Sequence, residues 1–367
     1  MVKKHIMVFH IPYLEWFKKN GYETYVCARN DYDNKEGCII PYCDKYFDLP
    51  FERSPLKLNN IKVYKQLKGL IDGNKFDIIH CHTPMGGALT RLASRDARKK
   101  GTSVIYTAHG FHFYKGAPIL NWLLYFPIEK WLSKYTDVLI TINKEDYTRA
   151  MKSFKAQDVK YVRGVGIDTK KFTQLSIDKK QKRKSINVPE NAFIIVSVGE
   201  VNKNKNHSIV IKALAKLNRS DIYYVICGQG PLESYLYSLA AELKIEKQIK
   251  LLGFRRDVNE ICQLANIFVF PSFREGLSVA LMEAMAAGLP VVCSDIRGNS
   301  DLIEDEKGGF LVDPYDVDNF ANALEKVYKS QKLRNFFSQN NTQHIKNYSL
   351  EIITDQMSKI YEKCSDK

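Results

Sequence analysis

Two glutamates and a glycine stand close together in residues 272–290, SFREGLSVALMEAMAAGLP. The apolar pattern predicts a helix from about Ser278, whose free N–H groups and positive dipole end point at the loop holding Glu275 and Gly276. Such a helix start is a site for a phosphate group. Glu283 lies further along, where its carboxylate can accept hydrogen bonds from two neighbouring ribose hydroxyls. Alternatively, Glu283 is a surface carboxylate and the Gly-Leu-Pro triplet an ordinary helix stop.

Lysines gather in a second segment, residues 197–207, SVGEVNKNKNH. Gly199, Lys203 and Lys205 stand there between a predicted buried strand and a predicted helix, at the carboxyl end of a sheet. Ligands of open α/β sheets bind at that edge. A lysine ammonium placed there neutralises a departing diphosphate without being consumed. The alternative is a solvated turn, since Asn and Lys are common turn residues.

Histidines and glycines follow two predicted strands of the first half. In YTAHGFHF, His109 and Gly110 come directly after a strand, although a lone histidine at such a point is more often structural than catalytic. In HCHTPMGG, Gly86 and Gly87 stand near a helix start, where glycine lets the backbone approach a ligand closely. These residues therefore mark the carboxyl edge of the first sheet.

Candidate metal ligands are few. His80 and His82 share one face at strand spacing, but no third or fourth ligand with suitable spacing follows. The D-x-D spelling at 31–33 lies in a polar turn, and that at 316–318 lies at a helix start, where aspartates cap. Neither a metal site nor a bound cofactor is expected.

Apolar strand-like runs alternate with helix-like segments along most of the chain. Continuous β-branched runs predict parallel strands buried on both faces, hence an α/β doubly wound sheet. The expected strands are residues 22–28, 76–82, 102–109, 137–143, 160–166, 192–199, 222–228, 250–254, 267–272, 290–295 and 309–313. The expected helices are 84–99, 119–134, 207–218, 231–245, 256–264, 278–287 and 316–330.

A charged stretch, SIDKKQKRKSIN, divides the chain, and the alternation of strands and helices begins again after it. We expect an N-terminal domain over residues 1–170, a charged linker over 171–190 and a second domain over 191–345. Residues 346–367 are expected to form a helical tail that packs back on the N-terminal domain.

The N-terminal segment departs from this pattern. A first βα unit needs a strand, a turn and then a helix, yet only about ten residues precede Pro12 and the helical pattern of Trp16 and Phe17. Either His5–Phe9 is a very short first strand or that strand is missing. Since strand one is central in a doubly wound sheet, its loss would be serious.

Length and composition set the class of protein. With 367 residues, 45% of them apolar, two domains are the first expectation. No uncharged apolar run of about 18 residues exists, and the first ten residues lack the apolar core and cleavage site of a signal peptide, so a cytoplasmic protein is expected. The eight cysteines form no C-x-x-C pair and read as reduced core thiols.

Positive charge is concentrated in the first half. Residues 1–170 contain 28 Lys and Arg against 17 Asp and Glu, whereas residues 171–367 contain 27 against 24. A one-sided basic surface suits nucleic acid, anionic lipid or a phosphate-bearing substrate, and a solvated lysine-rich surface is the plain alternative. No aromatic RNA-binding motif is interleaved with the basic residues, so no nucleic-acid partner is expected.

Taken together, these segments resemble the retaining GT-B glycosyltransferases of family 4, in particular the bacterial capsule and exopolysaccharide enzymes. The resemblance covers nearly the whole chain and is most specific in its second half. It implies two Rossmann-like doubly wound domains that face a cleft, with the acceptor on the N-terminal side. The motifs that carry it are HCHTPMGG, YTAHGFHF, VGEVNKNKNH, GQGP and SFREGLSVALMEAMAAGLPVVCSDIRGN.

The resemblance assigns roles to individual residues. Glu283 would bind the donor ribose, Glu275 would lie by the donor sugar and diphosphate, and Lys205 matches the family's diphosphate lysine. His109 matches the histidine that contacts the transferred sugar. The implied catalytic residues are His109, Glu275 and Lys205; the donor-binding residues are Gly199, Lys203, Lys205, Arg256, Glu275, Gly276, Leu277, Ser278 and Glu283; the acceptor-side residues are Gly86, Gly87, His109 and Gly110.

The sequence departs from the family pattern at two places. Many members carry an arginine after the glycine of the second-domain turn, whereas Glu200 follows Gly199 here, and Lys203 or Arg256 is expected to compensate. Similar proteins also have a strand and a short loop ahead of the segment that looks like HIMVFHIPYLEWFKKNGYE. That loop helps to form the acceptor side, so acceptor binding depends on it.

The implied activity is metal-independent transfer of a sugar from a nucleotide-sugar, expected to be a UDP-sugar, to a lipid-diphosphate-linked glycan with retention. Domain closure is expected to assemble the site, since the donor residues lie in the second half and His109 in the first. Two alternatives stay open. One is a GT-B nucleotide-sugar epimerase, and the other is a truncated, non-catalytic nucleotide-sugar-binding protein.

The basic first half is expected to hold the protein at the inner face of the plasma membrane as a peripheral protein. Each Lys or Arg near an anionic surface contributes about 1 kcal/mol, so a handful gives reversible, salt-sensitive docking. The candidate contacts are Lys57, Lys62, Lys65, Lys68, Arg95, Arg98, Lys99 and Lys100.

Overall fold

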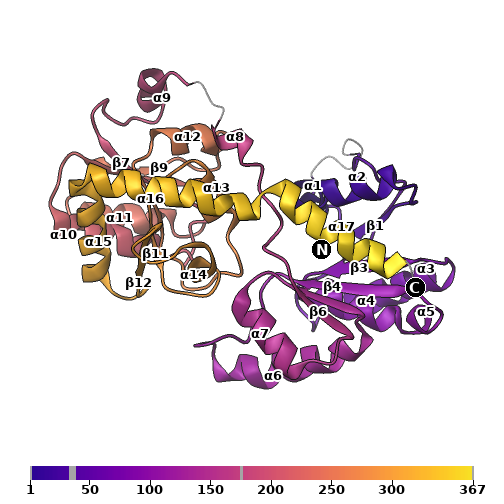
Figure 1. Ribbon diagram of the computed structural model, residues 1–367. Coiled ribbons are helices and arrows are strands. Elements are labelled where there is room, and N and C mark those ends of the chain that lie inside the picture. The colour runs from indigo at the N-terminus through magenta and orange to yellow at the C-terminus, as the bar shows by residue number, and fades with distance from the viewer. Residues whose placement is uncertain (1, 33–38, 174–176, 366–367) are drawn as a thin grey trace. The chain divides into compact units, whose positions relative to one another are not determined.

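A computed structural model describes residues 2–32, 39–173 and 177–365 (Figure 1). The chain divides into two compact units, one of Met1–Gly166 with Glu351–Lys367 and the other of Ile167–Leu350. The strands within these described ranges all pair in parallel, as continuous apolar runs alternating with helices require. The α/β class predicted from that alternation is confirmed.

The second unit is built on a six-stranded parallel sheet with the order β12-β11-β10-β7-β8-β9. Its side chains alternate between two buried cores: Ile194 and Val196 face one, and Ile195 faces the other. The sheet is therefore covered on both faces. Its strands are β7 (Phe193–Val198), β8 (Ile222–Cys227), β9 (Ile249–Leu251), β10 (Ile267–Phe270), β11 (Val291–Ser294) and β12 (Gly309–Val312).

Helices cover both faces of this sheet. One face carries α12 (Val258–Leu264), α13 (Val279–Ala286) and the 3-10 helix η3 (Ile345–Tyr348). The other carries α10 (His207–Leu217), α11 (Glu233–Glu242) and α15 (Val317–Lys329). The remaining helices of the unit are α8 (Lys170–Thr173), α9 (Lys179–Ser185), the 3-10 helix η2 (Glu246–Gln248), α14 (Asn299–Leu302) and α16 (Gln331–His344).

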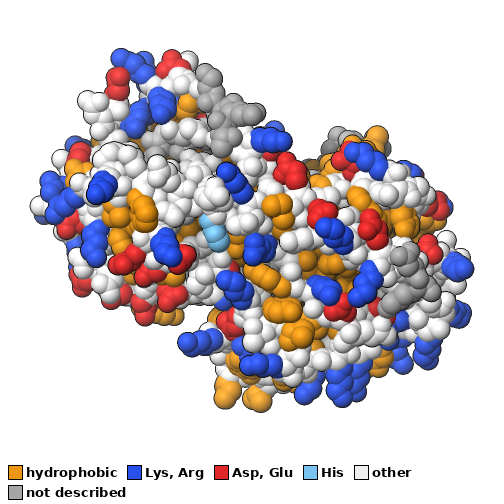
Figure 2. Space-filling model, in the orientation of Figure 1, with side chains coloured by type: hydrophobic (Ala, Val, Ile, Leu, Met, Phe, Trp, Pro, Cys, Tyr) orange, Lys and Arg blue, Asp and Glu red, His pale blue; other side chains and the backbone are white. Residues whose placement is uncertain are grey.

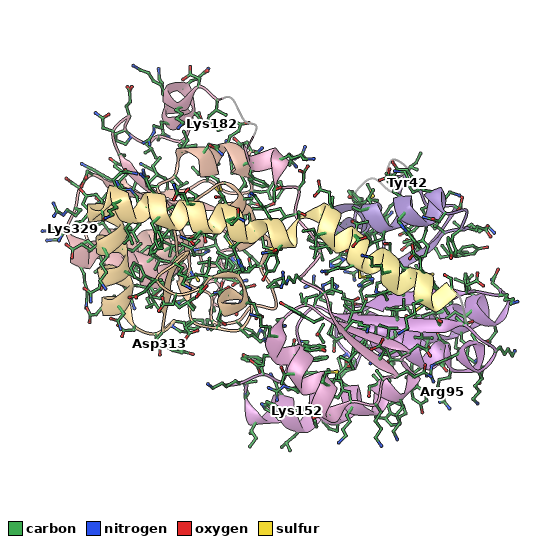
Figure 3. The ribbon with its side chains drawn as sticks, in the orientation of Figure 1. Tyr42, Arg95, Lys152, Lys182, Asp313 and Lys329 are labelled. Carbon is green, nitrogen blue, oxygen red and sulfur yellow. The ribbon has the colours of Figure 1, made fainter. Side chains whose placement is uncertain are left out.

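The stretch 171–190, expected as a linker, packs in the second unit wherever the structure describes it. Phe172, Ile186 and Val188 are buried in its core between the exposed charges. Lys182, on α9, pairs with Asp257 and Glu260 (Figure 3). A few apolar residues at suitable spacing thus fix a segment whose composition is mostly charged.

The first unit contains two parallel sheets. The larger has the order β3-β4-β5-β6, with β3 (Ile78–His82), β4 (Ser103–Ala108), β5 (Val138–Thr141) and β6 (Asp158–Tyr161). The smaller pairs β1 (Tyr25–Ala28) with β2 (Lys45–Asp48). Neighbouring β4 residues, Ile105 and Tyr106, belong to different cores, so the larger sheet is buried on both faces.

Helices from both ends of the chain pack on one face of the larger sheet. These are α2 (Ile11–Lys19) and α17 (Leu350–Ser365), whose Tyr361 hydroxyl lies 3.0 Å from Nδ1 of His80. The other face carries α4 (Pro84–Ala93), α6 (Ile119–Leu132) and α7 (Lys144–Ser153). The unit also contains α1 (Lys3–Phe9), α3 (Asn59–Asp72), α5 (Arg95–Lys99) and the 3-10 helix η1 (Ser133–Tyr135).

The N-terminal segment is helical, so of the two alternatives the short first strand at His5–Phe9 is wrong, and the structure describes no strand at these residues. These residues lie in α1, where the His10 N–H donates to the Ile6 carbonyl at 2.9 Å. Ile6 is buried against Val26, which gives the helix its apolar contact. The strands β1 and β3 do not pair, and both line a cavity of about 650 Å³.

Candidate functional site

The order of strands in the second unit determines where its candidate site forms. Chain order runs outward from β7 in one direction through β8 and β9, and in the other through β10, β11 and β12. The reversal falls between β7 and β10, and the loops after these two strands diverge there at the carboxyl edge of the sheet. Those loops carry Lys205 and Glu275, the residues singled out in the sequence.

An ion pair joins the two loops. Nζ of Lys205 lies 2.8 Å from Oε1 of Glu275, and the two side chains keep only 18% and 14% of their area exposed. The Lys205 ammonium also stands 4.4 Å from the centre of the Phe270 ring. The backbone completes the junction, because the Phe273 N–H donates to the Asn204 carbonyl at 2.8 Å. The structure therefore brings these two predicted catalytic residues together.

Glycines let the loops approach this closely. A Cβ on Gly199 would lie 2.9 Å from Cε of Lys205, and one on Gly298 would lie 2.3 Å from the Gly276 carbonyl oxygen. A Cβ on Gly228, in the GQGP motif, would lie 1.8 Å from the Gly199 carbonyl oxygen. The contacts of Gly228 and Gly298 are with backbone, which cannot yield as a flexible side chain can, so these two glycines are packing requirements of the site. Gly199 instead takes φ 153°, which disfavours other residues, and leaves room for the Lys205 side chain.

The start of α13 points at the same region. Ser278 is its N-cap, and the Ser278 hydroxyl accepts a hydrogen bond from the Leu281 N–H at 3.4 Å. Gly276 and Leu277 form the turn just before it, and Arg297 donates from Nε to the Glu275 carbonyl at 3.3 Å. The helix dipole and the N–H groups of its first turn thus favour an anion beside Glu275.

Glu283 lies on α13, about one turn after the helix start, and its side chain is half-buried. Its carboxylate makes no hydrogen bond to any residue that the structure describes. Burial raises the pKa of Glu283, and the charge of Lys171 on α8 opposes that shift. An unpaired, partly desolvated carboxylate is a strong acceptor for a ligand that brings its own hydroxyl groups.

The other two predicted cationic residues stand apart from the ion pair. Lys203 is exposed and lines a hollow of about 380 Å³ together with Tyr235 and Phe273. Arg256 is exposed in the loop after β9, whereas its neighbour Arg255 is paired with Asp257. Neither Lys203 nor Arg256 contacts Lys205 or Glu275 in the described residues.

Two residues near the site were not singled out from the sequence. Arg297 lies in the SDIRGN part of the quoted motif, immediately before the glycine that touches Gly276, and that position was the available signal. Lys171 acts on Glu283 from a segment distant in sequence. No local pattern predicts a contact of that kind.

In the first unit, His109 follows β4 and lies among other histidines. His82 Nδ1 and His109 Nε2 are 3.3 Å apart, and the rings of His5 and His109 are centred 5.4 Å apart. The rings of His10 and His82 are tilted and centred 4.2 Å apart, and those of His80 and His82 are centred 4.1 Å apart. We call these five residues, His5, His10, His80, His82 and His109, the histidine cluster. Only His80, His82 and His109 were noted from the sequence. The complete cluster could not be predicted, because its members come together only through the packing of segments such as α1 and β3.

Burial keeps the histidine cluster neutral. It lowers the pKa of His80 to about 3 and that of His109 to about 4, with repulsion from a neighbouring histidine as the second cause in each case. The pKa values of His10 and His82 are lowered well below 6.5 for the same two reasons. His109 is therefore a neutral imidazole near pH 7, with one nitrogen donating and the other accepting.

The backbone around His109 is fixed by a buried carboxylate. Gly110 takes φ 126°, which favours glycine, and Oδ2 of Asp146 accepts from the Phe111 N–H at 2.9 Å. Gly87 has a packing role, since a Cβ there would lie 2.4 Å from Cε2 of Tyr106. Gly86 lines the 650 Å³ cavity together with His82.

The possible metal ligands can also be placed. Asp316 caps α15 by accepting from the Asn319 N–H at 2.9 Å, as its D-x-D spelling at a helix start predicts. The first D-x-D spelling includes Asp33, which lies outside the described residues. Within the described ranges, no three His, Cys, Asp or Glu side chains are grouped so that they could hold a metal ion.

Two family models match the chain. The model described as Glycosyl transferases group 1 covers residues 178–344, and the model described as Glycosyl transferase 4-like covers residues 2–143. A protein of Bacillus subtilis (strain 168) described as the glycosyltransferase EpsD is 40% identical over 100% of this chain and 95% of its own length. The chain belongs to the group 1 glycosyltransferases, family GT4. The family suggested by its motifs is confirmed.

Further similarities agree with this family. The Escherichia coli UDP-Gal:alpha-D-GlcNAc-diphosphoundecaprenol alpha-1,3-galactosyltransferase is 32% identical over 78% of this glycosyltransferase and 76% of its own length. Anabaena HepE, solved with UDP-glucose, superimposes with a TM-score of 0.77 at 18% identity, covering 96% of this chain and 95% of its own. The glycosyltransferase therefore has the GT-B fold. No helix among its described residues is long and apolar enough to cross a membrane.

The histidine cluster predicts a loss of stability in mild acid. Its pKa values are depressed in the folded state, so the unfolded chain binds more protons below pH 6.5 and the free energy of unfolding falls with falling pH. We expect a loss of about 2 kcal/mol at pH 5 for each histidine that stays neutral in the fold. Urea unfolding at pH 7.5 and pH 5 measures it.

The matched variant is His82→Asn, which removes one member of the cluster. Its stability should depend less steeply on pH than that of the natural chain between pH 7.5 and 5. Carboxylates with ordinary pKa values titrate below this window, and Glu283, whose pKa burial raises, is present in both chains, so its contribution cancels in the comparison. Equal stability of the natural chain at the two pH values would contradict the prediction.

Proposed function

We propose that this glycosyltransferase transfers a sugar from a UDP-sugar to a lipid-diphosphate-linked glycan with retention at the anomeric carbon. Its place would be the cytoplasmic face of the plasma membrane, in capsule or exopolysaccharide synthesis. The observation that carries the proposal is the Lys205–Glu275 ion pair at 2.8 Å, which lies beside the start of α13. Glu283 lies on the same helix, about one turn after its start. These are the parts that a nucleoside diphosphate bound to a sugar requires.

The donor is proposed to bind with its ribose and its diphosphate at two neighbouring points of α13. Glu283 would accept from two ribose hydroxyls, which satisfies a half-buried carboxylate that has no protein partner in the described residues. The N–H groups of Gly276, Leu277 and Ser278, at the helix start, would meet the phosphates. Gly199 would let the diphosphate approach Lys205.

Charge on the diphosphate grows as the bond to the sugar breaks. Lys205 is already held at the site by Glu275 and by the Phe270 ring, so it stabilises that charge without rearranging. The acceptor hydroxyl would approach from the face that the diphosphate leaves, which gives retention. No side chain is assigned as a covalent nucleophile, and His109 is proposed to contact the transferred sugar as a neutral imidazole.

The acceptor class is proposed from the relatives. The E. coli relative acts on a diphosphoundecaprenol-linked sugar by its name. A Campylobacter jejuni relative, 36% identical over 38% of this chain and 38% of its own length, is likewise named for a diphospho-undecaprenol acceptor. Gly86, Gly87 and Gly110 are the proposed acceptor-side backbone.

Donor and activity are tested in sequence. Thermal shifts of the purified protein against UDP- and GDP-sugars identify the donor, and incubation with that donor and diphospholipid-linked glycans tests transfer. Conversion of the donor without an acceptor would indicate an epimerase. Donor binding without turnover on any acceptor would indicate a binding protein, and either result would refute the proposal.

Removing the carboxylate of Glu283 should weaken nucleotide binding. In Glu283→Ala the ribose hydroxyls lose their shared acceptor, which costs about 1–3 kcal/mol and raises Kd roughly 5- to 150-fold. Isothermal titration with UDP measures the change. Glu242→Ala, an exposed glutamate on α11 of the same unit, is the matched control. An unchanged Kd for Glu283→Ala would remove Glu283 from the donor site.

Removing the ammonium of Lys205 should lower kcat more than donor affinity. One preorganised electrostatic contact to a developing charge is worth about 10²–10³ in kcat. The variant Lys205→Ala also leaves the Glu275 carboxylate unpaired. The double variant Lys205→Ala/Glu275→Gln removes that unpaired charge, so it separates the loss of the ammonium from the effect of the unpaired carboxylate. Lys212→Ala, exposed on α10, is the control. Equal losses in kcat and in affinity would indicate ground-state binding instead.

Transfer should survive chelation of divalent ions. Lys205 and the start of α13 provide the positive charge that a metal ion would otherwise bring to the diphosphate. Initial rates measured with and without excess EDTA test this expectation. A rate that falls with EDTA and returns with magnesium or manganese would show that the transfer needs a metal.

A further inference from the structure

Helix α6 of the first unit exposes apolar side chains along its outer side. Their spacing of three and four residues places them on the side that faces away from the sheet. Trp122 and Phe126, on the opposite side, pack in the core. A surface helix normally has charged residues outside, so α6 is unusual in being apolar on both sides. The exposed residues are Ile119 (78%), Leu120 (59%), Leu123 (66%), Leu124 (50%), Ile128 (51%) and Trp131 (44%).

The charge around this face is positive. Glu129 is the one acidic residue of α6, and it is buried in an ion pair with Arg91 at 2.8 Å. Lys115 precedes the helix, and Lys130 and Lys134 are exposed at its end. Figure 2 shows apolar side chains at the lower edge of this unit, where Figure 1 places α6, with Lys and Arg nearby.

Neighbouring elements add basic residues on the same side. Arg95 lies over the ring of Tyr135 at 5.0 Å, and that ring is centred 5.5 Å from Trp131. Figure 3 labels Arg95 on α5 and Lys152 on α7, and both lie toward the lower side of this unit. The acidic neighbour Glu145 is neutralised by Arg149 at 2.7 Å.

We propose that α6 docks this protein on an anionic lipid bilayer, lying in the interface with its apolar face among the acyl chains. An apolar helix face ringed by Lys and Arg, without an exposed carboxylate of its own, matches the charge of that surface. The 14 residues of α6 span about 21 Å, less than the hydrocarbon core, so the helix lies on the membrane. The inference rests on the proposed function, which places the acceptor in that membrane.

This surface shares only Arg95 with the basic groups expected from the sequence. Lys68 is paired with Asp72 and Asp96, and Arg98 with Asp137, so part of that charge is already neutralised. An inserted apolar face also changes the expected salt dependence. Binding through α6 should weaken with salt but persist, because burial of apolar surface is not screened.

Co-sedimentation with vesicles tests the surface directly. The probes are phosphatidylcholine vesicles with and without about 30% phosphatidylglycerol, at about 0.1 and 0.5 M salt. The variant Leu120→Asp/Leu124→Asp/Ile128→Asp should bind anionic vesicles at least about tenfold more weakly than the natural chain. Leu56→Asp/Leu58→Asp/Ile61→Asp, which changes three apolar residues just before and in the first turn of α3 that are at least about as exposed, should bind almost normally.

Tryptophan fluorescence locates the contact. Trp131 is 44% exposed at the end of α6, so its emission should shift to the blue on anionic vesicles, and Trp131→Phe should lose most of that shift. Circular dichroism and thermal unfolding of the aspartate variants confirm that they fold.

Activity separates this inference from the proposed function. The α6 variant should transfer sugar normally to a short-chain, water-soluble acceptor and at least about tenfold more slowly to a lipid-linked acceptor in vesicles. Unchanged vesicle binding by the α6 variant, loss of binding by the α3 variant instead, or a change only in oligomeric state would overturn the docking surface. Failure of the natural chain to transfer to any acceptor, with vesicle binding intact, would refute only the proposed function.

Discussion

The reversal of strand order between β7 and β10 is the constraint on which the second unit's site depends. It leaves a gap at the carboxyl edge of a parallel sheet, and the loops after those strands close on it through one ion pair, Lys205 with Glu275 at 2.8 Å. The contact is possible only because glycines keep Cβ atoms out of the junction, as at Gly199 and Gly298. Replacing Gly199 would displace the Lys205 side chain, and replacing Gly298 would displace the backbone at Gly276 beside Glu275, so either change would move one of the two charges.

Much of the fold follows from periodicity. The strands of the second unit lie within two residues of the expected runs, except that β9 ends three residues earlier, because buried parallel strands are continuous and β-branched. The strand β2 was not expected, since KYFD is short, polar at both ends and only partly buried. Helix α1 was not expected either: the two alternatives were a very short strand at His5–Phe9 or a missing first strand, whereas Ile6 is buried from a helix against β1.

The residues of the candidate site likewise include some that could be placed from the sequence and some that could not. Motif residues that share one loop and one helix, such as Glu275 and Glu283, could be placed from the sequence because local geometry fixes their spacing. The histidine cluster could not, because His5 meets His109 only through the packing of α1 on the sheet. The outward apolar face of α6 was likewise hidden, since a helix that is apolar on both sides has no stripe to show which side is buried.

The net charge around the site explains why cations outside the Lys205–Glu275 ion pair are important for attracting the donor. Lys205 and Glu275 together carry no net charge, so the pair adds little long-range attraction for a doubly negative diphosphate, although the Lys205 ammonium can stabilise that charge at contact distance. Glu200, which follows Gly199, adds a negative charge nearby in sequence. The attraction must then come from the start of α13 and from exposed cations such as Lys203 and Arg256. Those cations are solvated and screened by salt, so we expect the attraction of the donor to the site to weaken as ionic strength rises. The geometry of the bound state should depend on ionic strength less strongly.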